Sequence, residues 1–163
     1  MYKLKYYQNE RSYITEERVR LVENCAQVVI DNMKETIQKC VGSSFKFDVI
    51  LPVLPSKQRD FQPVPELAKA ISIRSGIPID FESLIKVKET EELKSVEDKE
   101  SRAKMLRGKF AIKGSQLNRK NILIFDDLYR SGSTVKEITQ TIKDYHPETN
   151  VFLLTITKTK SKR

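Results

Sequence analysis

The stretch from Asn121 to Thr134 constrains the fold of this chain more than any other part of it. It opens with the apolar run Asn-Ile-Leu-Ile-Phe, whose length and composition are typical of a buried strand. Asp126 and Asp127 follow directly, and a short turn around Gly132 leads into a predicted helix from Ser133 to Tyr145. The segment therefore predicts a strand that delivers two carboxylates at its C-terminal end, close to the start of a helix.

Strands and helices alternate through the rest of the chain as well. This order predicts the α/β class, with a mostly parallel central sheet flanked by helices. The segment 91–106 is charged and weakly periodic, and it fits either a surface helix or a mobile flap. Helices are further predicted over 15–41 and 65–75, and strands over 2–7, 47–51, 83–87, 110–112 and 150–157.

The composition fits one globular domain. The chain has 163 residues, of which 39% are hydrophobic and 32% charged, and this excludes a disordered polypeptide. No apolar run approaches the roughly 18 residues of a membrane span, and the first residues do not resemble a signal peptide. Cys25 and Cys40 fall on one predicted helix, about 22 Å apart, so we expect reduced thiols, a cytoplasmic location and no membrane association.

The positive charge is concentrated in two places. Thirty basic and 22 acidic residues give a net charge of +8. Seven basic residues and no acidic one lie between Arg102 and Lys120, and four more lie between Lys158 and Arg163. Outside these two stretches the chain is slightly acidic. Only this local excess favours DNA as a partner, and it lacks the interleaved aromatic residues that stack on bases.

The turn after the two carboxylates has the features of an anion site. The free N–H groups and the positive end of the helix dipole attract a phosphate. Gly132 allows close backbone approach, and the hydroxyls of Ser131, Ser133 and Thr134 can donate hydrogen bonds. Beside a bound phosphate, the two acids would take sugar hydroxyls or a hydrated Mg²⁺, which prefers oxygen ligands. With one histidine and no Cys-x-x-Cys, the sequence offers no transition-metal motif.

Three alternatives share part of this pattern. P-loop enzymes also end a strand in acidic residues, but they require a GxxxxGK[ST] loop that this chain lacks. Response-regulator receivers carry their acidic pair near the start of the domain, whereas here it lies near the end. The plainest alternative is a helix N-terminus after a strand with two solvated carboxylates.

The stretch from Ile122 to Thr134 resembles the phosphoribosyl-diphosphate (PRPP) signature of type I phosphoribosyltransferases. The resemblance implies their fold, a loop for the ribose 5′-phosphate, and two acids that hold the ribose hydroxyls and, mostly through ribose or water, Mg²⁺. Arg130 departs from the pattern, because the family usually has Thr, Ser or Asp there and a guanidinium cannot act as a base. The implied phosphate loop is Arg130, Ser131, Gly132, Ser133 and Thr134, and the implied acids are Asp126 and Asp127.

A wider match points to the competence-associated ComF family. Three segments resemble its patterns: Arg59-Asp60-Phe61-Gln62 with Glu66-Leu67-Ala68, Lys86 to Thr90, and Arg102 to Phe110. Leu93, Met105 and Asp60 depart from the usual Gln, Asn and Gly. The match covers about Asp48 to the end, which divides the chain into an N-terminal extension (1–47), a phosphoribosyltransferase-like domain (48–157) and a basic tail (158–163). That family usually carries an N-terminal zinc finger, but residues 1–47 of this chain contain no Cys/His cluster that could form one.

The resemblance also implies two further parts of the site. A pyrophosphate loop would follow the strand at 47–51, and a flexible loop over 88–109 would close on PRPP. The plain alternatives are an ordinary edge loop and a solvated helix face. The implied pyrophosphate-binding residues are Leu54, Pro55, Ser56, Lys57 and Arg59, and the cations of the flexible loop are Lys88 and Arg102.

The function implied by the resemblance is Mg²⁺-dependent transfer of a phosphoribosyl group from PRPP to an acceptor, with release of pyrophosphate. The acceptor would be a nucleobase or an amine, and family members often form homodimers. Two other functions stay open at this point. One is a non-catalytic module that senses PRPP or a nucleotide and binds DNA or a DNA-processing protein, and the other is a structural domain with a degenerate site.

Overall fold

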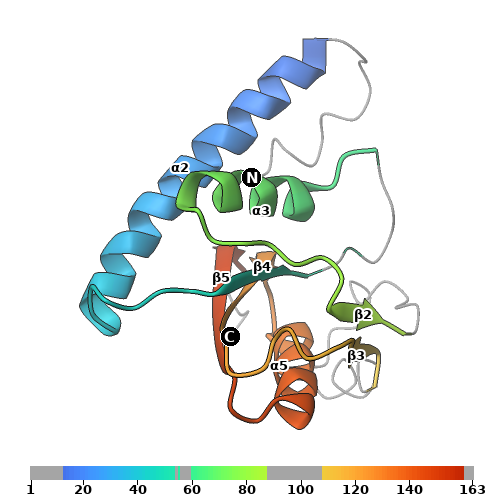
Figure 1. Cartoon of the computed structure of the whole chain (residues 1–163). Coiled ribbons are helices and arrows are strands. Elements are labelled where there is room, and N and C mark those ends of the chain that lie inside the picture. Colours follow the sequence, from blue (N-terminus) through green and yellow to red (C-terminus); the bar gives the residue numbers. More distant parts are fainter. Residues whose placement is uncertain (1–12, 54, 56–59, 88–107, 160–163) are drawn as a thin grey trace.

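A computed structural model describes residues 13–53, 55, 60–87 and 108–159 (Figure 1). Its centre is a three-stranded parallel sheet in the order β1-β4-β5. β1 covers Val49–Pro52, β4 covers Asn121–Tyr129 and β5 covers Asn150–Lys158. Residues 78–80 run along the free side of β1, where the Ile50 N–H donates to Pro78 O at 2.7 Å and the Asp80 N–H donates to Ile50 O at 3.0 Å.

The central strand β4 is longer than the sequence predicts. Its apolar run ends at Phe125, but pairing with β5 continues through Asp126 opposite Thr155 and on to Tyr129 opposite Lys158. The Thr157 hydroxyl donates to Asp127 O at 2.8 Å, and the Thr159 N–H donates to Tyr129 O at 3.1 Å. The expected strand end at Phe125 is therefore wrong, because backbone pairing holds four further residues in the sheet despite the charges of Asp126 and Asp127.

Two helices cover one face of the sheet (Figure 1). α2 covers Tyr13–Cys40 and packs against α3, which covers Pro63–Ser75. Val22, Ala26, Ile30 and Met33 of α2 are buried at helical spacing against α3, with Ile50, Leu123 and Phe125 beneath them. The predicted periodicity of this helix is correct except at its end, because Val41 lies outside the helix and is 46% exposed.

α3 begins two residues earlier than the sequence predicts. Pro63 and Pro65 both lie in its first turn, where a missing N–H costs no helical hydrogen bond. The predicted stop at Gly76 is confirmed, because Gly76 has φ 73° and its N–H donates to Ser72 O at 2.9 Å.

α5 and a small antiparallel sheet occupy the other face. α5 covers Ser133–Tyr145, as predicted, and buries Ile138 and Ile142 against Ile122 and Ile124 of β4. The predicted strands near 83–87 and 110–112 exist as β2 (Leu84–Lys86) and β3 (Phe110–Ile112). They pair with each other, not with the parallel sheet, and pack against α5.

Other sequence expectations fall outside the described residues or agree with them. The strand predicted over 2–7 and the segment 91–106 lie outside the described residues. Cys25 and Cys40 are both free, as their separation on one helix requires. Within the described ranges, no helix combines the length and apolarity needed to cross a membrane.

The packing of α2 on α3 leads to a stability prediction. Ala26 is fully buried at this contact, so Ala26→Leu inserts three carbon atoms into a filled space and lowers the free energy of unfolding by about 1–3 kcal/mol. The control Asn24→Leu, which places the same side chain on the exposed side of the same turn, shifts it by less than about 0.5 kcal/mol. Urea unfolding followed by circular dichroism measures both, and equal effects would contradict the packing of α2 described here.

Candidate functional site

The candidate site lies where β1 and β4 end at one edge of the sheet. Pro52 pairs with Phe125, and the Val53 N–H donates to Phe125 O at 2.9 Å. The chain therefore leaves β1 next to Asp126, and the segment that follows β1 starts beside the acidic pair. In open α/β sheets, ligands bind at this edge, outside the carboxyl ends of the strands.

The two carboxylates of the pair have different surroundings. Because β4 continues as a strand past Phe125, its side chains keep alternating between the two faces. Asp126 follows Ile122 and Ile124 on the face covered by α5, and Asp127 follows Phe125 on the face covered by α2 and α3. The Asp127 N–H donates to Asp126 Oδ1 at 2.9 Å. The sequence predicts two adjacent acids, and their side chains stay close enough that a hydrogen bond between them also raises the pKa of Asp126.

Asp126 is the titratable group most clearly perturbed at this edge. Burial and then the neighbouring charge of Asp127 raise the pKa of Asp126 from its ordinary 3.8 to about 6. Hydrogen bonds from the backbone N–H groups of Asp127 and Leu128 act in the opposite direction but do not cancel the rise. A carboxylate whose pKa is raised in this way is stabilised in its ionised form by a cation or a hydroxyl donor. Such perturbed pKa values are common at functional sites.

The turn after β4 has the conformation that an anion loop requires. Gly132, with φ 73°, is the N-cap residue of α5 and occupies the left-handed region that favours glycine. Its carbonyl accepts the Lys136 N–H at 2.8 Å, whereas no side chain caps the helix and its first turn contains no acidic residue. The hydroxyls of Ser131 and Ser133 lie 3.0 Å apart. The Ser133 N–H makes a long hydrogen bond to Ser131 Oγ, at 3.5 Å, so the first turn of α5 and the two convergent hydroxyls suit a phosphate.

Tyr129 is a site residue that sequence reasoning missed. Its ring lies against Gly132, since a Cβ placed on Gly132 would come within 2.8 Å of the ring carbon Cζ. The Lys158 ammonium lies 5.9 Å from the centre of the same ring. Tyr129 occupies one of the two spacer positions between the acids and the loop, where the signature prescribes no residue type. A side chain at position 132 would force the Tyr129 ring to shift, so glycine suits this position for space as well as for backbone conformation.

Glu137 is a second residue near the site that no pattern in the sequence predicts. Its Oε1 accepts the Gly108 N–H at 2.7 Å, and the Val87 N–H donates to Lys109 O at 2.9 Å. Both ends of the segment 88–107 are therefore held at the β2–β3 pair, and one of them is tied to the helix that begins at the anion loop. The contact joins residues 29 positions apart, which no local pattern reveals.

Several predicted site residues lie outside the described residues. Among the predicted pyrophosphate-binding residues, Pro55 is described and is exposed. Asp60, one departure from the ComF pattern, is exposed, and the other two departures, Leu93 and Met105, are not described. Also outside the described residues are Leu54, Ser56, Lys57, Arg59, Lys88 and Arg102.

The metal-ligating potential of the site rests on the acidic pair. The described ranges contain no group of three or more His, Cys, Asp or Glu side chains that could hold a metal ion. The single histidine, His146, is buried, and its Nε2 lies 3.2 Å from Gly114 O. Two carboxylates without a protein cage fit Mg²⁺, which binds to one or two carboxylates and completes its shell with water and substrate oxygens.

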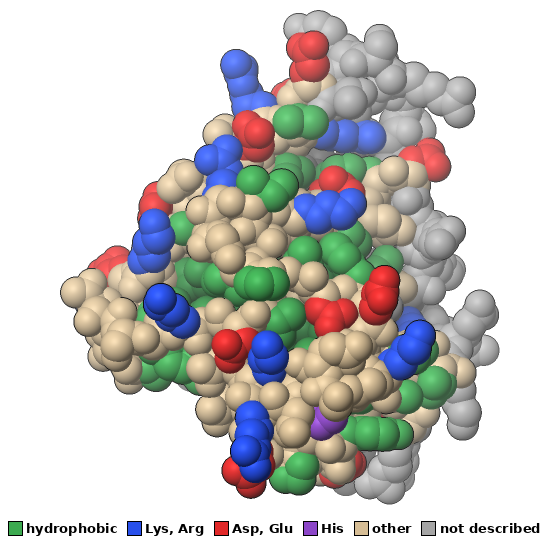
Figure 2. Space-filling model, in the orientation of Figure 1, with side chains coloured by type: hydrophobic (Ala, Val, Ile, Leu, Met, Phe, Trp, Pro, Cys, Tyr) green, Lys and Arg blue, Asp and Glu red, His purple; other side chains and the backbone are tan. Residues whose placement is uncertain are grey.

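Charge on the face shown in Figure 2 is mixed. Basic and acidic side chains alternate along α2, with apolar side chains visible between them. This face therefore does not present a continuous basic surface of the kind that binds a nucleic-acid backbone.

Comparison with known proteins identifies the fold. No protein-family model matches the sequence, and no curated protein sequence matches it. The structure is similar to glutamine PRPP amidotransferase from B. subtilis, with a TM-score of 0.51 and 18% identity, over 82% of this chain and 25% of that one. It is also similar to hypoxanthine phosphoribosyl transferase of Trypanosoma cruzi, with a TM-score of 0.51 and 13% identity, over 86% of this chain and 66% of that one.

These similarities confirm the expected fold class, which is the α/β fold of type I phosphoribosyltransferases. The identities are too low to show more than the fold. This chain spans about a quarter of the length of the amidotransferase.

The raised pKa of Asp126 predicts how stability depends on pH. Between about pH 4 and 6 the folded protein holds a proton that the unfolded chain has lost, so the free energy of unfolding falls as the pH rises through this window. We expect a fall on the order of 2 kcal/mol from this group. Asp126→Asn removes the fall, so the variant is more stable than the wild type at pH 8 and similar to it at pH 4.

Urea unfolding of both proteins from pH 4 to pH 8 measures this difference. The control is Glu17→Gln, which removes a carboxylate from an exposed position of α2 and keeps the fall that Asp126 causes. Parallel profiles for the wild type and Asp126→Asn would show that Asp126 titrates normally.

Proposed function

We propose that this protein binds PRPP and transfers its phosphoribosyl group to a nitrogen acceptor, with release of pyrophosphate. The observation that carries the proposal is the turn at Gly132. Gly132 has a left-handed backbone conformation at the start of α5, no side chain caps the helix there, and two hydroxyls converge beside it. It follows β4, the strand that carries Asp126, whose pKa is raised to about 6, in a chain with the type I phosphoribosyltransferase fold.

The ribose 5′-phosphate would bind at the turn. Its oxygens would accept hydrogen bonds from the first N–H groups of α5 and from the hydroxyls of Ser131, Ser133 and Thr134. The bond between Ser131 and Ser133 would then be exchanged for two bonds to the anion. Arg130 is exposed at the start of the turn and would add a permanent positive charge, not a base.

The ribose hydroxyls would bind at the acidic pair. Asp126 accepts hydrogen bonds best when it is ionised. Because burial leaves its carboxylate poorly hydrated, the ribose hydroxyls would supply the hydrogen bonds that water does not. Mg²⁺, when bound with PRPP, would neutralise charge on the pyrophosphate as it leaves. Asp126 and Asp127 are the residues that would hold it, mostly through ribose oxygens or water.

The remaining residues would serve the leaving group and exclude water. As the bond between the anomeric carbon and pyrophosphate breaks, positive charge develops on the sugar, and the acceptor nitrogen forms the new bond and loses its proton. The segment after β1 starts beside Asp126, which suits Leu54, Pro55, Ser56, Lys57 and Arg59 for binding pyrophosphate. Lys88 and Arg102 belong to the segment held by the β2–β3 pair and Glu137, and we propose that this segment covers the site.

Turnover distinguishes an enzyme from a sensor. We propose a nucleobase or an amine as the acceptor. The sequence retains the PRPP signature, whereas its three departures from the ComF pattern leave the identity of the acceptor open. Binding of PRPP without pyrophosphate release across a broad panel of acceptors would instead support a sensing module that acts through DNA or a DNA-processing protein.

Calorimetric titration with PRPP and Mg²⁺ tests the proposal. The wild type binds PRPP, and Thr134→Val, which removes one hydroxyl from the turn, weakens binding by about 10- to 150-fold because a hydrogen bond to a charged group is lost. Asp127→Asn is scored for pyrophosphate release as well as for binding, and we expect release to fall more than binding.

Thr139→Val is the matched control, because it makes the same change in the same helix more than one turn away from the anion loop. It leaves PRPP binding unchanged. If PRPP neither binds to the wild type nor raises its melting temperature at millimolar concentration with Mg²⁺, the proposed function is wrong.

A further inference from the structure

Tyr129 and Lys158 are neighbours at the C-terminal edge of the sheet, next to the turn that carries the anion loop. They lie directly opposite each other in the pairing of β4 with β5, and the Thr159 N–H donates to Tyr129 O at 3.1 Å just beyond them. The Lys158 ammonium lies 5.9 Å from the centre of the Tyr129 ring, so both side chains lie on the same side of the sheet. β5 therefore brings a cation to the strand end from which the anion loop begins.

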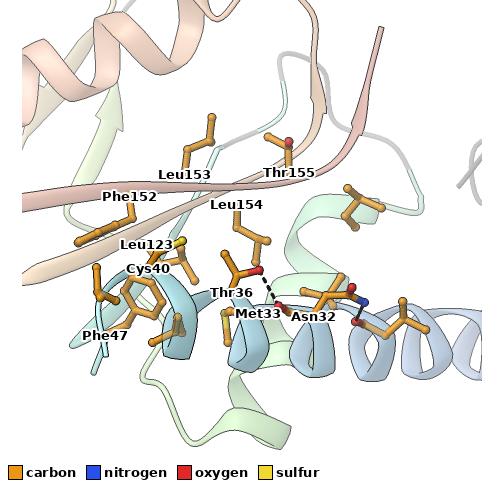
Figure 3. A pocket seen from close by; sticks show the side chains of 15 residues that line it. Asn32, Met33, Thr36, Cys40, Phe47, Leu123, Phe152, Leu153, Leu154 and Thr155 are labelled. Carbon is orange, nitrogen blue, oxygen red and sulfur yellow. Dashed lines mark hydrogen bonds between the residues drawn. The ribbon is translucent and has the colours of Figure 1, made fainter. Parts of the chain in front are cut away.

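The side of the sheet that carries this pair is the one that faces α2. Figure 3 shows Phe152 and Leu154 pointing from β5 toward α2, beside an apolar groove of about 420 Å³, with Leu153 pointing to the other side. Side chains alternate along a strand, so Lys158, four residues after Leu154, lies on the α2 side as well. The groove extends along β5 as far as Ile156. On this side β5 therefore changes from apolar to basic at its last residue, at the edge where ligands bind.

The Tyr129 ring takes space that a side chain of the helix N-cap residue would otherwise fill. A Cβ on Gly132 would lie 2.8 Å from the ring carbon Cζ, and the phenolic oxygen is nearer still. N-cap side chains usually hydrogen-bond to N–H groups of the first helical turn, and Gly132 has no side chain to do so. The phenolic oxygen therefore lies beside the start of α5, where a phosphate would replace the missing cap.

The charge at the turn leaves a role for both groups. A phosphate monoester carries about two negative charges at neutral pH, and Asp126 and Asp127 lie close by. Arg130 supplies one positive charge at the turn, and Lys158 supplies a second. Within the described residues, neither the Tyr129 hydroxyl nor the Lys158 ammonium has a hydrogen-bond or ion-pair partner. A phenolic O–H is a good donor to a charged oxygen.

We propose that the Tyr129 hydroxyl donates a hydrogen bond to the phosphate at the anion loop and that the Lys158 ammonium supplies a second positive charge there. The inference rests on the proposed function in one respect, which is the binding of a sugar phosphate at this turn. The order of the sheet is β1-β4-β5, so the pair lies on the β5 side of β4, whereas the proposed pyrophosphate loop begins at β1. The two residues therefore serve the sugar 5′-phosphate and not the pyrophosphate.

Calorimetric titration with ribose 5-phosphate, and with PRPP and Mg²⁺, tests the two roles. Tyr129→Phe keeps the ring and its contact with Gly132 but removes the hydroxyl, so a merely structural role of Tyr129 leaves binding unchanged. We expect this variant to bind both ligands about 10- to 150-fold more weakly, because a hydrogen bond to a charged group is lost. Lys158→Gln binds both about 2- to 5-fold more weakly at about 50 mM salt, and the difference shrinks at about 500 mM, since salt screens an exposed charge.

Tyr145→Phe and Lys143→Gln are the matched controls, because they make the same two changes at the other end of α5. Tyr145 is 58% exposed there, and both controls leave binding unchanged. Wild-type affinity for ribose 5-phosphate in Tyr129→Phe overturns the role of the hydroxyl, and wild-type affinity in Lys158→Gln overturns that of the ammonium. A loss confined to PRPP shows that the two groups contact the pyrophosphate, which also overturns the inference.

The same titrations separate this inference from the proposed function. If the wild type binds PRPP and Tyr129→Phe binds it equally well, the inference is wrong and the proposed function is unaffected. If ribose 5-phosphate binds with the expected losses but PRPP does not bind, the proposed function is wrong and the inference holds. A wild type that binds neither ligand contradicts both.

Discussion

Burial of β4 on both faces is the constraint on which the rest of the molecule depends. Leu123 and Phe125 pack under α2 and α3, and Ile122 and Ile124 pack under α5, so the strand joins the two halves of the core. A strand enclosed in this way cannot place a charged residue next to its apolar run without taking it partly out of water. The raised pKa of Asp126 is therefore a consequence of the same burial that holds the sheet together.

Asp80 shows that burial alone does not determine how a carboxylate behaves. Burial raises its pKa too, but the Ser83 hydroxyl and the backbone N–H groups of Ser83 and Glu82 all donate to it and together lower the pKa. Its hydrogen bonds are made within its own turn, so it is a structural residue. Asp126 receives fewer such bonds and lies beside a second negative charge. Its own charge is therefore left for a cation or hydrogen-bond donor of a ligand to stabilise.

Local patterns in the sequence predicted those parts of the structure that local forces determine. The bounds of α5 follow from its apolar spacing and from Gly132, and the end of α3 follows from Gly76. The end of β4 was missed because pairing with β5, more than twenty residues later, outweighs the polarity of Asp126 and Asp127. The contacts of Tyr129 with Gly132 and of Glu137 with Gly108 depend on how elements pack, so no spacing rule could identify them.

The anchoring of Val87 and Gly108 has a consequence for the evolution of this fold. The chain leaves the core at β2 and re-enters it at β3 through adjacent strands, so the distance that the intervening segment must span does not depend on its length. Closing a loop twice as long costs only about 0.6 kcal/mol more. Insertions and deletions between these two residues can therefore accumulate at little cost to stability, which leaves related chains free to differ here in length and in the chemistry that they bring to a common site.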